Sequence, residues 1–359
     1  MKKYCLFVMV IIFSLYSFPK PGIAYNPKKY ISYKLETPII CDGNITDSEW
    51  KDVEWSSYFV DIEGDLKPKP RLKTRVKMGF DKNYFYFAAE MEEPHIWGTL
   101  TERDAVIYFD NDIEIFIDPD GDTHNYYELE INSLGTEWDL FITTPYRDKF
   151  CHAIDSWDIA GIKTGVSLDG TINDNSDIDK KWCVEVAIPW KVLEEAAPHG
   201  GMPKDKEQWK VNFSRVQWEL DKVGKGYKKS VDENGKTLPE NNWVWSPQGI
   251  IAMHYPEMWG IVQFSHNSPK NKVEFIPNPE DSIRYFLREI YYFQREYYEK
   301  NNTYAKNLSE QLKILGKNHK LTTDITTLGD HYYIMCTNLL TNKRWYLRSD
   351  GKIWSEEKK

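Results

Sequence analysis

Short runs of alternating apolar and polar side chains fill the chain from about residue 30 to residue 264. The clearest are Tyr84–Met91, Ile113–Asp118, Tyr126–Asn132, Trp182–Ile188 and Trp209–Trp218. A period of two is typical of strands that place one face in a core. Dipeptides such as Asp42-Gly43 suit the turns between strands. The pattern predicts an all-β domain, an antiparallel β-sandwich of the jelly-roll or immunoglobulin-like two-sheet type.

The alternation also assigns side chains to the two faces of the sheet. In the run at 113–118, Ile113, Ile115 and Ile117 face the core, and in the run at 126–132 the inward side chains are Tyr127, Leu129 and Ile131. The opposite face of both runs carries Glu114, Phe116, Asp118, Glu128, Glu130 and Asn132. We therefore expect two neighbouring strands to share one polar, partly aromatic face.

The pattern changes near residue 268, where prolines mark a linker over 267–279. Apolar residues at three-to-four spacing then predict a helix over Glu280–Leu315, followed by two strands that turn at Asp350-Gly351. Within the sandwich, the best helix candidate is Trp190–Ala197. We predict a β-sandwich over 30–266 and a C-terminal extension of helix and small β-hairpin over 280–359.

The first 24 residues have the pattern of a secretory signal peptide. Lys2 and Lys3 precede an apolar run from Tyr4 to Phe18, and small residues lead up to Ala24. That run is shorter than the roughly 20 residues that span a bilayer. We expect no integral membrane span, and export to the periplasm, the cell surface or the extracellular space.

Charge and cysteine content narrow the class of partner. The formal net charge is −9, and removal of residues 1–24 takes away three lysines and makes it −12. An acidic protein is a poor ligand for phosphate backbones, so we expect no nucleic-acid partner. The remaining cysteines have irregular spacing that matches neither a zinc site nor a disulfide scaffold, and are expected to be buried thiols: Cys41, Cys151, Cys183 and Cys336. Aromatic residues reach 15%, which favours a binding role for flat rings.

Seven segments in order resemble carbohydrate-binding module family 9 and the domains similar to it. They are Pro38–Trp50, Gly79–Pro94, Phe109–Gly121, Tyr126–Thr136, Lys181–Leu193, Trp209–Trp218 and the WSPQ…HYPEMWGIVQF segment that ends at Phe264. The resemblance implies a β-sandwich that binds a sugar between two aromatic rings, with polar side chains beneath. It implies carbohydrate binding without catalysis, in support of polysaccharide catabolism, with a saccharide or polysaccharide as the ligand.

The resemblance also implies positions for the sugar site. The first stacking ring falls at Tyr108 and the second in the loop at His254 and Tyr255. Glu114 matches the acidic hydrogen-bonding residue of the family, Asn132 also fits, and Glu130 stands where the family has an arginine. The candidate ligand-binding residues are Tyr108, Glu114, Glu130, Asn132, Arg215, His254, Trp97 and Trp245, with Trp138, Trp157 and Trp243 as further platforms.

Each candidate has a structural alternative. Glu114 and Arg215 either contact a ligand or pair with each other across one face, and alternating acidic residues are often simply a solvated face. His254 either contacts a ligand or caps its loop, and the rings of Trp97 and Trp157 either bind or fold back on their loops. Five tryptophans are predicted to be core residues: Trp50, Trp182, Trp190, Trp209 and Trp259.

Three other chemistries stay open. Asp110, Asp112, Glu114, Glu128 and Glu130 can supply the carboxylate pair of a glycoside hydrolase. Asp118, Asp120 and Asp122 suit a structural calcium ion, which the resemblance also implies, although a plain turn explains them equally well. A haem-binding sandwich would draw its axial ligands from Met91, Met253 and His254.

Overall fold

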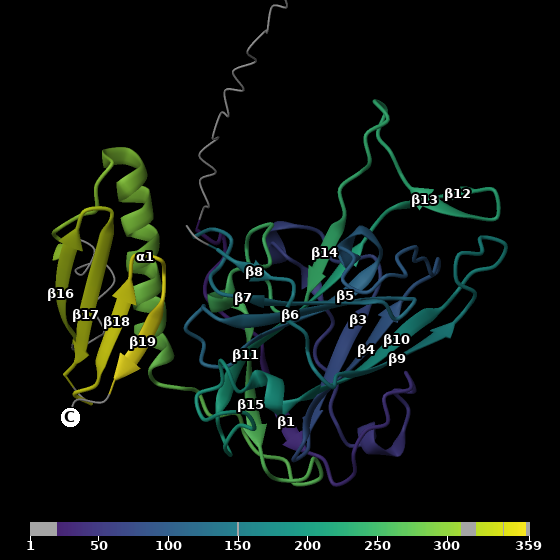
Figure 1. The fold of residues 1–359 in the computed structure, drawn as a ribbon, viewed down its shortest axis with the longest axis horizontal. Helices are drawn as coiled ribbons and strands as arrows, with labels where there is room; N and C mark the ends of the chain where they lie inside the picture. Colours follow the sequence, from purple (N-terminus) through teal and green to yellow (C-terminus); the bar gives the residue numbers. More distant parts are fainter. Residues whose placement is uncertain (1–19, 149–150, 310–320, 340, 357–359) are drawn as a thin grey trace, which may run out of the picture.

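A computed structural model describes residues 20–148, 151–309, 321–339 and 341–356 of the chain. These residues form a large curled sheet, a small hairpin, and a C-terminal unit of one helix and a four-stranded sheet (Figure 1). No helix in this part of the chain has both the length and the apolar character needed to cross a membrane. Residues 1–19 of the predicted signal peptide lie outside the described residues.

The large sheet has 13 strands among the described residues, in the order β8-β7-β6-β5-β11-β15-β1-β3-β4-β10-β9, with β14 on β11 and β2 on β14. The strands are β1 (Lys29–Lys34), β2 (Val60–Asp61), β3 (Thr74–Phe80), β4 (Tyr84–Glu92), β5 (Asp112–Asp118), β6 (Tyr126–Asn132), β7 (Glu137–Ile142), β8 (Ala153–Ile154), β9 (Lys163–Asp169), β10 (Lys181–Pro189), β11 (Gln208–Gln217), β14 (Asn241–Val244) and β15 (Gly260–Ser265). The small hairpin pairs β12 (Leu220–Val223) with β13 (Gly226–Lys229). Single 3₁₀ turns occur at η1 (Ser48–Trp50), η2 (Gly64–Leu66), η3 (Ile107–Phe109), η4 (Trp190–Leu193) and η5 (Pro256–Met258).

The five predicted strands are confirmed as β4, β5, β6, β10 and β11. The prediction of a purely antiparallel arrangement is wrong, because β1 runs parallel to both of its neighbours, β15 and β3. β1 enters between the last strand of the large sheet and an early one. Alternation within one strand carries no information on such a distant pairing.

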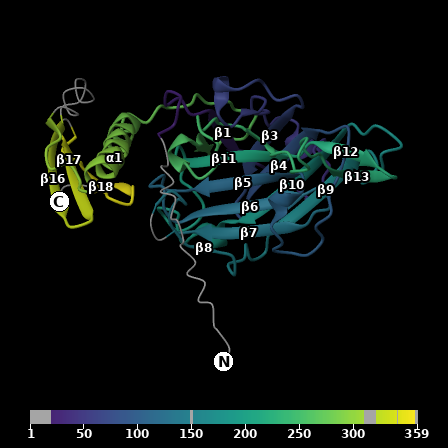
Figure 2. The ribbon, with the colours of Figure 1, turned by 90° about the horizontal axis from the view of Figure 1, so that it is seen from above.

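The curled sheet forms two layers around one core. β5, β6 and β11 contribute one wall, and β3, β4 and β10 contribute the other. Figure 2 shows β5, β6 and β7 side by side. The predicted inward side chains at 113, 115 and 117 and at 127, 129 and 131 all belong to this core. All five tryptophans predicted to be core residues are buried, at 5% exposure or less.

The outer faces of both layers are covered by other parts of the chain. Residues 35–53 pack over β4 and β10, where Trp50 donates its indole N–H to Glu185 at 2.6 Å. On the other layer, Phe116 and Tyr126 pack against Trp259 and Met253 from the segment before β15. This second cover lies on the face that carries the predicted polar residues.

The helix predicted at Trp190–Ala197 is wrong in length and type, since only the 3₁₀ turn η4 at Trp190–Leu193 forms. Turn residues follow η4 over 194–196, and Pro198 cannot donate a backbone hydrogen bond to extend a helix. The C-terminal helix is confirmed as α1 (Asp281–Asn301), but it ends earlier than predicted, at Asn302 in the left-handed conformation with φ 52°. Residues 310–315 of the predicted helix lie outside the described residues.

The C-terminal sheet has four strands in place of the predicted hairpin: β16 (Leu321–Leu328), β17 (His331–Asn338), β18 (Arg344–Arg348) and β19 (Ile353–Glu356). The predicted turn at Asp350-Gly351 joins β18 to β19. The sequence did not predict β16, because its threonine-rich sequence, LTTDITTL, has few apolar positions. One face of this sheet packs on α1 through Ile334, Trp345 and Leu347.

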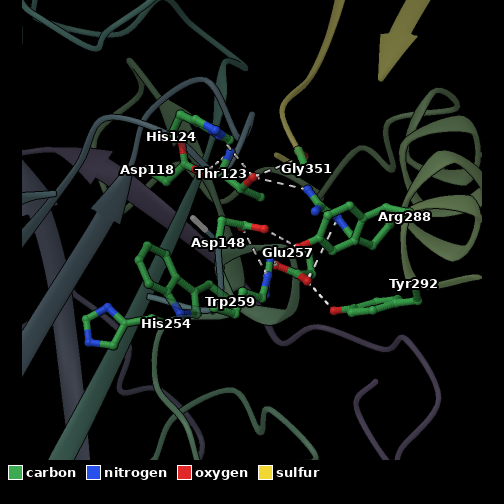
Figure 3. A network of polar contacts seen from close by, with 12 residues as sticks. Asp118, Thr123, His124, Asp148, His254, Glu257, Trp259, Arg288, Tyr292 and Gly351 are labelled. Atoms are coloured by element: carbon green, nitrogen blue, oxygen red, sulfur yellow. Dashed lines mark hydrogen bonds and ion pairs between the residues drawn. The ribbon is translucent and has the colours of Figure 1, made fainter. Parts of the chain in front are cut away.

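A buried polar network fastens α1 to the sandwich (Figure 3). Glu257 accepts a hydrogen bond from Arg147 at 2.9 Å and another from Tyr292, and Arg288 lies 3.8 Å away. Burial would raise the pKa of Glu257, but Arg147 and Arg288 outweigh it and hold the pKa at about 2. The carboxylate therefore stays ionised and ties the C-terminal unit to the sandwich.

Candidate functional site

Four carboxylates gather on the outer face of β5 and β6, as the alternation predicts. Glu114 on β5 lies directly opposite Glu130 on β6, and Asp112 and Glu128 stand one position away on the same face. Ser214 on β11 lies opposite Glu114 from the other side. Carboxylate oxygens of Asp112, Glu114 and Glu130 come within 4.8 Å of one another.

This acidic face is closed to solvent, which corrects the expectation of a solvated face. Asp112 is 0% exposed, Glu130 2%, Glu128 4% and Glu114 6%. The segment around Met253 and Trp259 covers the neighbouring apolar part of the face. A ligand the size of a sugar ring therefore meets the edge of the carboxylate cluster and not its interior.

Burial and mutual repulsion alter the acidity of the cluster. Burial raises the pKa of Glu114 to about 7. Burial, followed by the charges of neighbouring carboxylates, raises the pKa values of Asp112, Glu128 and Glu130 well above their ordinary range. Like charges directly opposite each other destabilise a sheet, so the cluster holds protons at a pH where free carboxyl groups are ionised.

Tyr108 forms one rim of the acidic face. It lies in η3, its backbone N–H donates to Glu130 at 2.9 Å, and its carbonyl accepts from the Trp218 indole at 2.9 Å. Its ring is 36% exposed and lies 6.4 Å from the ring of Trp138. Burial and the charge of Glu130 raise the pKa of Tyr108, in keeping with a hydroxyl close to the cluster.

Tyr146, in the segment after β7, forms a second rim. Its ring is 45% exposed and packs edge-on against His254 with centroids 4.3 Å apart. Burial and the charges of Glu128 and Glu130 raise the pKa of Tyr146. Two exposed tyrosines from separate loops thus border the same carboxylates.

His254 supports this second rim. Its Nδ1 lies 2.9 Å from the hydroxyl of Tyr126, and burial followed by the charge of Arg147 lowers its pKa to about 3. The ring is therefore neutral at physiological pH. Tyr255, the other residue of the predicted second platform, is 1% exposed and packs in the C-terminal cluster, so it offers no surface to a ligand.

Arg215 does not join the site, which corrects both predictions made for it. Its side chain points to the opposite side of β11 from Ser214, where it donates to Glu93 at 3.0 Å and to Thr74 at 3.0 Å. It is 1% exposed. The predicted pairing of Glu114 with Arg215 is wrong.

Three other candidates serve the fold. Asn132 donates to Asp110 at 3.0 Å and accepts from the backbone N–H groups of Leu134 and Thr136, so its amide is fully used in the turn after β6. Trp245 is 1% exposed in the core, and Trp97 is 6% exposed and packs on Trp218. Neither ring offers a stacking face, because other side chains cover both.

Of the further platforms, Trp138 lies on the acidic face opposite Glu130. Trp157 packs on Tyr127 and Phe141 with centroids 5.2 and 5.9 Å away, and Trp243 is 3% exposed. Trp138 is thus the one of the three that adjoins the site.

The aspartate loop after β5, where a calcium ion is predicted, contacts two cationic side chains. Carboxylate oxygens of Asp118, Asp120 and Asp122 come within 4.8 Å of one another. Lys352 stands 2.7 Å from Asp122, and Arg284 donates to the carbonyls of residues 120 and 121 at 2.9 and 2.6 Å. Lys352 offsets part of the negative charge of the loop, both cations come from the C-terminal unit, and the calcium ion stays a prediction.

The residues considered for haem do not converge. Met91 is 0% exposed in the core between the layers, whereas Met253 packs in the cluster on the outer face. The ring of His254 is held by Tyr126 and Tyr146.

The four cysteines among the described residues are free thiols.

Sequence reasoning missed Tyr146 and Ser214 as parts of the site. Tyr146 lies in a loop with no periodicity, and its position depends on contacts with His254, more than 100 residues away. Ser214 shares the outward face of β11, but its place beside Glu114 depends on the pairing of β11 with β5. Period-two alternation along β11 predicts on which face Ser214 lies. Only the order of the strands in the sheet shows that its neighbour on that face is Glu114.

Residues 40–237 match the family described as carbohydrate family 9 binding domain-like. A solved structure of a candidate carbohydrate-binding protein from Bacteroides uniformis ATCC 8492 is similar, with 17% identity, a TM-score of 0.49, and coverage of 67% of this chain and 100% of that chain. A family 9 carbohydrate-binding module from Caldicellulosiruptor kristjanssonii in complex with cellotriose has 17% identity, a TM-score of 0.41, and coverage of 70% and 100%. The corresponding glucose complex has 16% identity, a TM-score of 0.41, and coverage of 68% and 99%. No curated protein matches the chain.

Proposed function

The chain belongs to the carbohydrate family 9 binding domain-like family, and we propose that it binds a saccharide, without transforming it, at the rim between Tyr108 and Tyr146. The observation that carries this proposal is the pair of exposed tyrosines on separate loops beside one group of carboxylates. Tyr58 and Phe109 are also exposed, at 48% and 50%, and the ring of Phe109 lies beside that of Tyr108 with centroids 4.8 Å apart. The rim therefore supplies the stacking surface that a sugar needs.

The chemistry of a sugar suits this rim. Pyranose rings have apolar C–H faces that stack on aromatic rings, and hydroxyl edges that need directed acceptors. Tyr108 and Tyr146 supply rings and hydroxyls, and Glu114, the most exposed of the four carboxylates at 6%, supplies an acceptor at the edge. Ring stacking gives most of the affinity in this arrangement, and the acceptor selects the orientation.

Both rims are held in place before a ligand arrives. The hydrogen bond from the Tyr108 backbone to Glu130 fixes one, and the packing of His254 against Tyr146 fixes the other. Pre-organised side chains lose little conformational entropy on binding. Glu130 therefore contributes to sugar binding by holding Tyr108 in position.

Export in support of polysaccharide breakdown is the second part of the proposal. The signal-peptide pattern of residues 1–24 supports this part of the proposal. Two contacts of residues 20 and 22 distinguish between possible sites of cleavage by a signal peptidase. Gly22 donates to the carbonyl of Gly249 at 2.7 Å, and Lys20 forms an ion pair with Glu289. A cut before Lys20 keeps both contacts, whereas a cut after Ala24 removes them. N-terminal sequencing of the exported protein distinguishes the two sites.

Calorimetry against a panel of mono- and oligosaccharides tests the binding proposal. We expect Tyr108→Ala and Tyr146→Ala each to weaken binding by about tenfold, from the loss of one stacking ring. Tyr333→Ala is the matched control, because Tyr333 is 39% exposed on β17 of the C-terminal sheet. Affinities that both rim variants leave unchanged, or a wild-type protein that binds no saccharide, would refute the proposal.

A glycoside hydrolase is the competing function, and the proximity of the carboxylates favours it. Retaining enzymes place two carboxyl groups about 5 Å apart, and the oxygens of Asp112, Glu114 and Glu130 lie within 4.8 Å. Burial opposes this function, because a glycosidic bond must reach both groups. Chromatography of the same saccharides after incubation decides between the two: products formed by the wild type but not by Glu114→Gln would establish hydrolysis.

A further inference from the structure

Three groups of carboxylates among the described residues bring their oxygens within 4.8 Å, and they differ in how their charge is balanced. Arg103 balances the first, at 2.7 Å from Asp139 and 3.1 Å from Asp158. Lys352 balances the aspartate loop at Asp122. Within the described residues, no Lys, Arg or His forms an ion pair with the third group, which consists of Asp112, Glu114 and Glu130.

The unbalanced group is also the most completely buried. Its three members are 0–6% exposed, and Glu128 beside them is 4% exposed. In the first group, by contrast, Asp104 and Asp158 lie at the surface. A buried charge with no partner is far more costly than an exposed one, so this cluster takes up either protons, in line with its raised pKa values, or a cation from outside the chain.

Unused oxygen atoms point to what supplies that charge. Asp112 Oδ2 is buried and has no hydrogen-bond partner, and the buried hydroxyl of Ser214 contacts Glu114 from the neighbouring strand. Ser214 is 0% exposed and lies opposite Glu114 on the same face. A neutral hydroxyl that faces a carboxylate group adds a further oxygen donor, independent of the acidic residues.

We propose that Asp112, Glu114 and Glu130, with Glu128 and Ser214, bind a divalent cation of the calcium class beneath the sugar-binding rim. Hard cations of this class take six to eight oxygen ligands at about 2.3–2.6 Å. Carboxylates and a hydroxyl are donors of that kind, and no softer nitrogen or sulfur donor belongs to the group.

This cation site goes beyond the proposed sugar binding and does not depend on it. Its link to the rim is Glu130, which would ligate the ion through its carboxylate while it accepts the backbone N–H of Tyr108. The ion would thereby also hold Tyr108 in place. Metal binding is measured without saccharide, so failure of one proposal leaves the other standing.

The test is calcium calorimetry and terbium luminescence on the full chain after EDTA treatment. We expect one calcium ion per chain, and terbium emission excited through the adjacent Trp138 that calcium displaces. Asp112→Asn and Glu130→Gln should each weaken calcium binding by about tenfold or more, because affinity follows the number of charged ligands. Asp122→Asn, in the aspartate loop, is the matched control and should bind as the wild type does.

Thermal unfolding in EDTA guards against variants that merely misfold. Removal of one charge relieves repulsion in the empty cluster, so we expect Asp112→Asn and Glu130→Gln to melt higher than the wild type, by on the order of 3 °C. Three results would each overturn the proposal. They are a wild type with no saturable calcium binding, calcium affinities of Asp112→Asn and Glu130→Gln equal to that of the wild type, and a loss of calcium binding confined to Asp122→Asn. Lower melting temperatures of both variants in EDTA would also overturn it, because the chain itself would then be balancing the cluster.

Discussion

Arg215 donates a hydrogen bond to Glu93 at 3.0 Å, on the side of β11 that faces away from Glu114. Both side chains are buried, at 1% and 2% exposure. Burial lowers the pKa of Arg215 to about 10, while the charge of Glu93 acts against the lowering. The pair therefore keeps a guanidinium ionised inside the protein, and leaves the carboxylates on the other face without that cation.

Loss of Glu93 should destabilise the fold without touching the sugar site. Glu93→Gln leaves the charge of Arg215 buried and unbalanced, and we expect a loss of about 3–5 kcal/mol in the free energy of unfolding. Urea denaturation measures it. Glu233→Gln, at an exposed turn position, is the control. A loss below about 1 kcal/mol for Glu93→Gln would mean that Gln217 and Thr74 alone satisfy the guanidinium.

The faces of the strands could be predicted from the sequence, but the neighbours of each side chain could not. Alternation placed Ile115 in the core and Glu114 outside it, since that depends on one strand alone. The partner of Arg215 is 122 residues away, and the burial of Glu130 depends on segments that alternation does not locate. Distant packing, and not local pattern, decides which polar residues meet.

The C-terminal helix should influence the rim formed by Tyr146. Tyr291 on α1 donates its hydroxyl to Asp148, two residues after Tyr146, and Arg295 binds the same carboxylate at 3.0 Å. Tyr291→Phe removes a buried hydrogen bond to a charged group, so we expect a loss of about 1–3 kcal/mol in stability. Faster amide exchange over residues 143–148, read by mass spectrometry, should accompany it.

Tyr298→Phe is the matched control on the same helix, because its hydroxyl bonds to Asp330 at 3.2 Å on the surface. We expect no change in the exchange of residues 143–148 for this variant. Equal exchange in the two variants would show that α1 does not order the Tyr146 loop.

His254 should make stability depend on pH in the mildly acidic range. Its pKa is lowered to about 3 by burial and by Arg147, against about 6.5 in an unfolded chain. Unfolding then takes up a proton below pH 6.5, so the stabilisation is complete above that pH and is lost as the pH falls towards 3. One proton gives a slope of about 1.4 kcal/mol per pH unit.

Urea denaturation between pH 6.5 and 5 measures this slope before most carboxylates of the unfolded chain titrate. The raised pKa values of the Glu114 cluster contribute a slope of opposite sign that is common to both proteins. His254→Asn cannot take up the proton, so we expect the slope of its stability against pH to be more negative than that of the wild type by up to about 1.4 kcal/mol per pH unit. Parallel profiles for the two proteins would contradict a buried neutral imidazole at this position.

Gly165 should tolerate no side chain, because the turn at Cys41–Gly43 crosses β9 directly above it. A Cβ at Gly165 would lie 2.4 Å from the Cys41 carbonyl oxygen and 2.6 Å from the Cα of Asp42. Backbone atoms cannot move aside as a flexible side chain can, so the turn must lift off the strand. We expect Gly165→Ala to cost about 3 kcal/mol in the free energy of unfolding, at the upper end for overpacking.

Gly200→Ala is the control. The φ of Gly200 is +72° but nothing lies within 4 Å, so only backbone strain of about 1–2 kcal/mol applies. Because the Gly43 N–H also donates to Glu185 at 2.9 Å, a displaced turn would lose that bond as well, and near-ultraviolet circular dichroism of Trp50, which bonds to the same Glu185, should change in Gly165→Ala alone.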